Sequence, residues 1–152
     1  MRKGLLILFL ALITGHALAA DSTPIEKVKE VAALDIHGDW RPIFDNTPTP
    51  LMHKYFSAAF NQAWAAAMKH NKDYPVFDGD PLTGAQTGGG IKSISAQMVG
   101  PNRVAAAMTL RDGSSDSIEF VMLHTPTGEW LINDIKYPDG KSLRQILGAA
   151  DR

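Results

Sequence analysis

The sequence predicts an α+β fold, in which N-terminal helices pack on a curved antiparallel four-stranded meander and a short helix ends the chain. In the first half of the chain, apolar residues recur at the spacing of a helix face. In the second half, four short runs alternate apolar and polar residues, and glycine-containing turn sequences separate them. Consecutive strands joined by short turns pair antiparallel, so this half predicts a meander.

The N-terminus has the residue order of a secretory signal peptide. Arg2 and Lys3 precede the apolar run GLLILFLALITG, and small residues follow in HALAAD. The apolar run is too short to span a bilayer comfortably, although an uncleaved membrane anchor is the alternative. We therefore expect residues 1–20 to be removed by cleavage on either side of Ala20. Residues 21–152 then form a single domain without stable membrane insertion.

The amino-acid composition limits the cellular compartments and the classes of partner that are expected. The chain has no Cys, which excludes disulfides, thiol catalysis and a lipoprotein anchor. A secreted domain without disulfides fits a bacterial periplasm, so a periplasmic or secreted location is expected. Loss of Arg2 and Lys3 changes the balance from 15 bases and 16 acids to 13 and 16, a net charge of −3. No basic run stands out, so nucleic acid is not an expected partner.

The first predicted helix begins after Thr23. Thr23 suits the N-cap, Pro24 suits the first helical position, and Glu26 completes a capping box. Gly38 is the expected stop. The apolar stripe of this helix consists of Ile25, Val28, Val31 and Ala32.

A proline-rich link over residues 39–50 follows, with room for a helical turn around Ile43 and Phe44. One long helix is then expected over residues 50–70, with Thr49 as its N-cap. Its wide apolar stripe predicts the main helical face of the core, directed at the sheet. The stripe consists of Met52, Phe56, Phe60, Ala63, Trp64 and Ala67.

Residues 71–90 are dense in Gly, Pro and Asp, and they predict the longest irregular stretch of the mature chain. The four expected strands then cover residues 91–99, 103–111, 117–124 and 129–137. In the last strand, the alternation places Asp134 on the face of Trp130 and Ile132. A short C-terminal helix with an apolar stripe is expected from Leu143, Ile146 and Leu147.

Two segments carry a resemblance to a known family. The segments are FDGDPLTGAQ, from Phe77 to Gln86, and WLINDIKYPDGKSL, from Trp130 to Leu143. Together with the helices before them, they resemble a family of small exported bacterial proteins called domain of unknown function 3828. The resemblance implies a cone-like fold similar to nuclear transport factor 2 and the cystatins. It implies no catalytic residue, and this fold hosts enzymes and binding modules alike.

A metal site is a weak candidate in the irregular stretch. Asp78 and Asp80 form a DGD sequence, with Asp73 upstream. A calcium site needs six or more oxygen ligands, and Leu82 and Gly84 occupy positions where an EF-hand would supply the next ones. The aspartates are instead expected to bond nearby backbone amides. His37, His53, His70 and His124 lack a zinc-ligand spacing, so neither a metal nor a cofactor is expected.

Acid–base chemistry has two candidate residues. Asp134 or His124 could face the inside of the cone, where burial would raise the pKa of a carboxyl group. The competing interpretation, which we favour, is that Asp134 ends its strand and accepts hydrogen bonds from the turn around Tyr137 and Gly140. No nucleophile motif is present, and TGGGIKS lacks the spacing of a phosphate-binding loop.

The leading hypothesis from the sequence is a non-enzymatic periplasmic binding or interaction module with a protein or small-molecule partner. One alternative is a small-molecule enzyme of the isomerase or dehydratase type that works in a cone-shaped pocket. Another is an inhibitor or immunity-type protein that acts on a secreted partner through the long loop. The candidate ligand-binding residues are Asp78, Asp80, Gln86, His124, Asp134 and Tyr137.

Overall fold

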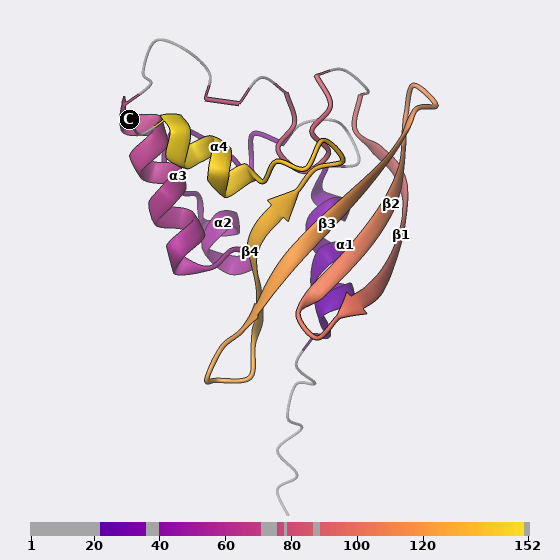
Figure 1. Cartoon of the computed structure of the whole chain (residues 1–152), viewed down its shortest axis with the longest axis horizontal. Helices are drawn as coiled ribbons and strands as arrows, with labels where there is room; N and C mark the ends of the chain where they lie inside the picture. The colour runs from indigo at the N-terminus through magenta and orange to yellow at the C-terminus, as the bar shows by residue number, and fades with distance from the viewer. Residues whose placement is uncertain (1–21, 36–39, 71–75, 78, 87–88, 151–152) are drawn as a thin grey trace, which may run out of the picture.

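The computed structural model describes residues 22–35, 40–70, 76–77, 79–86 and 89–150 (Figure 1). The proposed signal peptide, Gly38, Asp73 and Asp78 lie outside these ranges. The fold is α+β, as the sequence predicts. Its elements are α1 (Pro24–Leu34), α2 (Pro50–Tyr55), α3 (Ala58–His70), β1 (Ile91–Gly100), β2 (Arg103–Leu110), β3 (Ser115–His124), β4 (Trp130–Lys136) and α4 (Leu143–Ala150).

The four strands form one antiparallel sheet in the order β1-β2-β3-β4. One face of the sheet is covered, because α1 packs against β1, β2 and β4 (Figure 1). The helices α3 and α4 pack on each other and against β4, so they extend the layer beyond the sheet edge. The predicted inward residues of β2 and β3 are all buried on the covered face: Val104, Ala106, Met108, Leu110, Ile118, Phe120 and Met122.

The predicted cap of α1 is confirmed. The Thr23 hydroxyl accepts from the Glu26 N–H at 3.2 Å, and the Glu26 carboxylate accepts from the Thr23 N–H at 2.7 Å. This reciprocal pair satisfies two backbone donors that no helical carbonyl can reach. The helix ends at Leu34, with Asp35 as its C-cap.

The single long helix predicted over residues 50–70 is wrong, because the chain breaks it at Phe56 and Ser57. Phe56 is extended (φ −115°, ψ 149°) and forms a parallel bridge with Ile132 of β4. The Ser57 N–H donates to the Ile132 carbonyl at 2.9 Å, and its hydroxyl accepts from the Phe60 N–H at 3.1 Å. The break therefore supplies a backbone partner to the outer edge of β4, and Ser57 caps the new helix α3.

The predicted register of β4 is also wrong beyond Ile132. Met122 of β3 pairs with Ile132, but the preceding residue of β3, Val121, pairs with Asp134. Asn133 is therefore an extra residue, a β-bulge, and it reverses the alternation. Ile132 and Ile135 are both fully buried, while Asp134 lies on the opposite face from them, beside Val121.

The C-terminal strand end, turn and helix agree with the sequence. Pairing stops at Lys136, before Pro138, and Gly140 takes a positive φ of 83° in the turn. Leu143 and Leu147 of α4 are fully buried. Among the helices in the described part of the chain, none is both long and apolar enough to cross a membrane.

Candidate functional site

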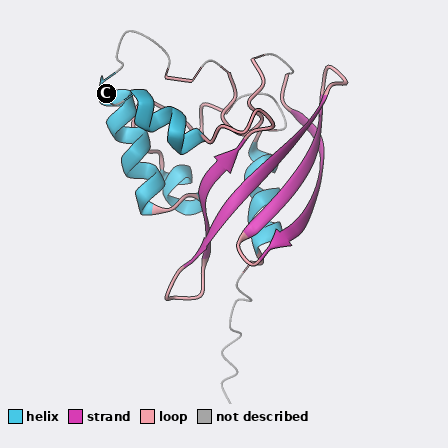
Figure 2. Cartoon of the chain, in the orientation of Figure 1, coloured by secondary structure: helices cyan, strands magenta, loops and turns pink. Residues whose placement is uncertain are grey.

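An aromatic pocket of about 230 Å³ is lined by the residue 40–46 turn, by α3 and by the stretch before β1, whose Phe77 stacks on Tyr137 just after β4. Figure 2 shows loops from several parts of the chain meeting at the end of the molecule where β1 begins and β4 ends. Four rings line the pocket, those of Trp40, Phe44, Trp64 and Phe77. Met68, Val76 and Pro81 complete its apolar wall, and Arg41, Asp45 and Asn46 supply its polar groups.

A single helical turn positions two of the rings. The N–H groups of Ile43 and Phe44 both donate to the Trp40 carbonyl at 2.9 Å, which confirms the turn predicted there. The Thr49 hydroxyl donates to the Ile43 carbonyl at 2.7 Å and so ties the turn to the start of α2. Since Ile43 is fully buried, it anchors the turn in the core.

The third ring comes from α3. The Trp64 indole N–H donates to the Asp45 carbonyl at 2.6 Å, and its ring lies 5.0 Å from that of Phe44. Trp64 is only 3% exposed, so its expected place in the core is confirmed while one part of it lines the pocket. The indole N–H has its partner already, and the ring therefore offers the pocket mainly apolar surface.

The fourth ring comes from the irregular stretch before β1. Phe77 stacks on Tyr137, with ring centroids 5.6 Å apart and planes inclined by 26°. The Tyr137 hydroxyl donates to the Pro81 carbonyl at 2.7 Å. Tyr137 therefore holds two residues of the pocket wall, Phe77 by stacking and Pro81 by a hydrogen bond.

Asp80 organises the loop that follows Phe77. Its carboxylate accepts from the Leu82 N–H at 2.8 Å and from the Thr83 hydroxyl at 3.0 Å. Its backbone N–H donates to the Ala85 carbonyl at 2.9 Å, and its carbonyl accepts from the Gly84 N–H at 2.8 Å. The expectation that Asp80 bonds backbone amides and shapes this loop is confirmed.

No sequence pattern predicts the burial of the carboxyl group of Asp35. Asp35, the C-cap of α1, is fully buried, and its backbone carbonyl accepts from the Ile91 N–H at 3.3 Å. Burial raises the pKa of Asp80, while the hydrogen bonds from the Leu82 N–H and the Thr83 hydroxyl act in the opposite direction. Burial, followed by the charges of nearby aspartates, raises the pKa of Tyr137 far above its usual value.

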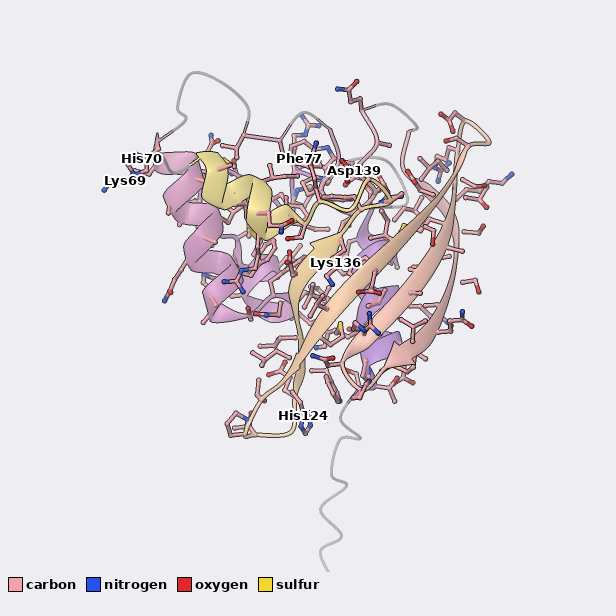
Figure 3. All side chains as sticks on the ribbon, in the orientation of Figure 1. Lys69, His70, Phe77, His124, Lys136 and Asp139 are labelled. Atoms are coloured by element: carbon pink, nitrogen blue, oxygen red, sulfur yellow. The ribbon has the colours of Figure 1, made fainter. Side chains whose placement is uncertain are left out.

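The structure brings together two of the predicted binding residues, Asp80 and Tyr137, and leaves others apart. Gln86 is exposed farther along the same loop, and Asp78 lies outside the described residues. His124 lies at the opposite end of the molecule from Phe77 (Figure 3). There its ring packs on Trp130 at 4.5 Å, and its Nε2 lies 3.0 Å from the Gly128 carbonyl oxygen.

Asp134 accepts a backbone hydrogen bond from the first turn of α4. Its carboxylate accepts from the Ile135 N–H at 2.8 Å and from the Arg144 N–H at 3.0 Å. The second bond satisfies a donor in the first turn of α4, where a carboxylate also interacts favourably with the helix dipole. The expectation that Asp134 accepts hydrogen bonds is confirmed, with Arg144 rather than the turn residues as the donor.

Replacing Asp134 should therefore lower the free energy of unfolding, and alanine should lower it more than asparagine. Asp134→Ala removes the acceptor of two backbone bonds and is expected to lower the free energy of unfolding by about 1–3 kcal/mol. Asp134→Asn keeps an acceptor oxygen and loses only the charge, so a loss of about 0.3–1 kcal/mol is expected. Urea melts of both variants test this order, and equal losses would contradict it.

The aromatic pocket was not predicted as a site. Trp40 and Phe77 are far apart in the sequence. Trp40 lies in the proline-rich link and Phe77 lies in the irregular stretch, and neither segment has the periodicity of a helix or strand. Only the meeting of the residue 40–46 turn, α3 and the loop carrying Phe77 joins the rings. Among the described residues, no three His, Asp or Glu side chains form a group that could hold a metal ion.

Comparison with known proteins gives no relative from which to read a function. No family model matches the chain, and no similar curated protein or solved structure was found. The resemblance of the sequence to domain of unknown function 3828 stays a prediction.

Proposed function

We propose that this protein is an exported, non-enzymatic binding module, and that its ligand is a small molecule with a single six-membered ring, which is held in the aromatic pocket. The observation that carries the proposal is the pocket itself, with four rings on its wall. The export part of the proposal comes from the signal-peptide pattern of residues 1–20.

The size of the pocket limits the ligand. Its 230 Å³ exceed the volume of about 150 Å³ at which an apolar cavity accepts benzene. They fall below the ~300 Å³ at which pockets for drug-sized molecules begin. One six-membered ring with a short substituent therefore suits the space better than a fused ring system or a sugar chain.

The polar groups orient that ligand. Arg41 and Asn46 carry hydrogen-bond donors at the pocket, and Asp45 carries a carboxylate that accepts from the Asn46 N–H at 2.7 Å. Apolar pockets with a few polar groups on one side commonly fix the orientation of a ligand by its substituent. We therefore expect a ring that bears a hydroxyl or carboxylate group.

Two further observations support binding over catalysis. The covered face of the sheet is filled by side chains such as Phe120, Met108 and Ile132, all of which are buried. Asp134, one candidate for acid–base chemistry, accepts two backbone hydrogen bonds at the start of α4.

Tryptophan fluorescence offers a direct test. The three tryptophans are Trp40, Trp64 and Trp130, and Trp130→Phe leaves only the two in the pocket. Benzyl alcohol and benzoate should change the emission of this variant saturably, with a Kd on the order of 1 mM, equivalent to about −4 kcal/mol. Ethanol and acetate, which lack the ring, should not.

A second substitution locates the binding. Phe77→Ala in the Trp130→Phe background removes one ring of the wall and should weaken ring binding by about tenfold, equivalent to roughly 1.4 kcal/mol. Leu123→Ala is the control, since Leu123 is 42% exposed and lies outside the pocket. Unchanged binding in Phe77→Ala, or no response to either ring probe, would contradict the proposal.

A further inference from the structure

The two edges of the sheet differ in their surroundings. On the outer side of β4, Phe56 forms a bridge with Ile132 and Ser142 forms a bridge with Lys136. β1 lies at the opposite end of the sheet, and within the described residues it pairs with β2 alone (Figure 1). In this part of the chain, the outer side of β1 therefore presents backbone N–H and C=O groups to which another strand can bind.

The central part of β1 lacks the features by which edge strands usually avoid such pairing. Residues 93–98 pair regularly with residues 104–109, because the register shifts of β1 lie before Ser93 and after Met98. This segment, SISAQM, contains no charged residue, no Pro and no Gly, and Lys92 precedes it. Charges, prolines and bulges are the usual protection of an edge strand, so residues 93–98 are open to a further strand.

The covered face of the sheet is incompletely buried along β1. The residues of β2 that pair with Ile94, Ala96 and Met98 are all buried. In β1 itself, Met98 is 40% exposed, and Ile94 and Ala96 are half-buried although they belong to the same face. The helix α1 packs on β1 but leaves this apolar row, which we call the edge row, partly in contact with water. Its burial would favour association.

We propose that β1 is a dimerisation surface, on which a second copy of this chain adds its own β1 antiparallel about a two-fold axis at Ala96. The two sheets then form one continuous sheet across the axis. Since no residue of β1 lines the aromatic pocket, this proposal does not depend on the proposed function.

The edge row is complementary to itself about this axis. Directly opposite residues of an antiparallel pair lie on the same face, and their side chains touch. The axis places Ala96 opposite Ala96 of the partner subunit, and Met98 opposite Ile94 of the partner subunit. Each exposed Met98 thus meets a half-buried Ile94, and the small Ala96 lies between the two contacts.

Charge and closure also favour a second copy as the occupant. Lys92 is the only charged residue of β1, and the antiparallel arrangement places the two copies of Lys92 at opposite ends of the strand pair. A two-fold contact uses the same surface of both copies, so it closes at a dimer. The bridges to Phe56 and Ser142 already occupy the outer side of β4, which disfavours head-to-tail growth from β1 to β4.

The dimer should be weak, and its concentration dependence measures it. One strand pair with a narrow apolar row belongs to the class of small interfaces, below about 1,200 Å². A Kd on the order of 10–100 μM is therefore expected. Sedimentation velocity of the purified protein from about 1 μM to about 1 mM should show the mass rising from that of the monomer to twice that value.

A lysine on the edge should prevent the association. Ser95 is exposed on β1, and Ser95→Lys places a charge of each copy beside the axis. The Kd of the dimer should rise by about tenfold or more. Ser117→Lys is the matched control, because Ala107 pairs with both Ser95 and Ser117, and Ser117 is an exposed residue of the inner strand β3. It should leave the Kd unchanged.

A single introduced thiol locates the axis. The chain has no Cys, so Ala96→Cys provides one thiol per copy. Opposite residues of an antiparallel pair have Cα atoms about 4.5–5.5 Å apart. That separation lies within the range of about 4.4–6.8 Å that a disulfide spans. Mild oxidation should therefore cross-link Ala96→Cys into a covalent dimer, and Ser117→Cys should cross-link far more slowly.

The results decide the proposal as follows. A dimer that Ser95→Lys weakens and that cross-links preferentially through Ala96→Cys supports it. A monomer at every concentration overturns it, and so does growth beyond a dimer, because a two-fold contact closes. A dimer that persists in Ser95→Lys, or that cross-links no faster through Ala96→Cys than through Ser117→Cys, overturns it as well.

Discussion

Phe60→Ala is expected to lower the free energy of unfolding by about 3–5 kcal/mol. Phe60 is fully buried, and its ring stacks on that of Phe56 with centroids 4.6 Å apart. Phe56 packs edge-on against Phe44 at 5.3 Å, so the truncation opens a cavity in a continuous aromatic cluster. The loss combines the transfer free energy of the ring with the cost of that cavity.

Urea denaturation of Phe60→Ala and the parent protein measures this effect. The control is Leu123→Ala on the exposed part of β3, which should change the free energy of unfolding by less than about 0.5 kcal/mol. A loss below about 1 kcal/mol in Phe60→Ala would place its ring outside the core and would contradict the assigned packing.

Deletion of residues 143–152 should have the largest effect. It removes Leu143 and Leu147, both fully buried, at a cost of roughly 2–5 kcal/mol each. It also uncovers α3 and leaves the Asp134 carboxylate without the Arg144 donor. The sum is comparable with the 5–15 kcal/mol that stabilises an average domain. The truncated protein should therefore lose its cooperative thermal transition.

The double variant Leu143→Ala and Leu147→Ala separates packing from chain length. It should reproduce most of the loss, because it empties the same interface while keeping the helix. Gly148→Ala is the matched control on α4, where an added Cβ meets no atom within 4 Å. It should raise the free energy of unfolding by about 0.5–1 kcal/mol. A truncated protein with an unchanged melt would contradict the role assigned to α4.

Local signals made much of the fold predictable. Thr23, Pro24 and Glu26 act within one helical turn, so their sequence alone determines the cap. The alternation of apolar and polar residues in β2 and β3 predicts their buried face correctly, because no bulge interrupts the pairing of these two strands. Pro138 and Gly140 likewise mark the end of the last strand without help from the rest of the chain.

Features that depend on distant partners were missed. Nothing near Asn133 announces a bulge, and this one extra residue moved Asp134 away from the face predicted for it. Ser57 can cap a helix, but the residues on both sides of it favour a continuous helix. The break is stabilised by the hydrogen bond from the Ser57 N–H to the Ile132 carbonyl, which is distant in the sequence. The pocket joins segments that irregular chain separates, so no periodicity in the sequence indicates it.

Methyl NMR of the methionines tests the central claim, which is ring binding in the aromatic pocket. Met68 lines the pocket, Met108 lies in the core beneath the sheet, and Met98 is 40% exposed on the edge strand β1. Titration with benzyl alcohol should shift the Met68 methyl signal saturably, because a bound ring lies against it, and should leave Met98 and Met108 in place. A Met68 signal that does not move, or one that moves no more than that of Met98, would contradict the account.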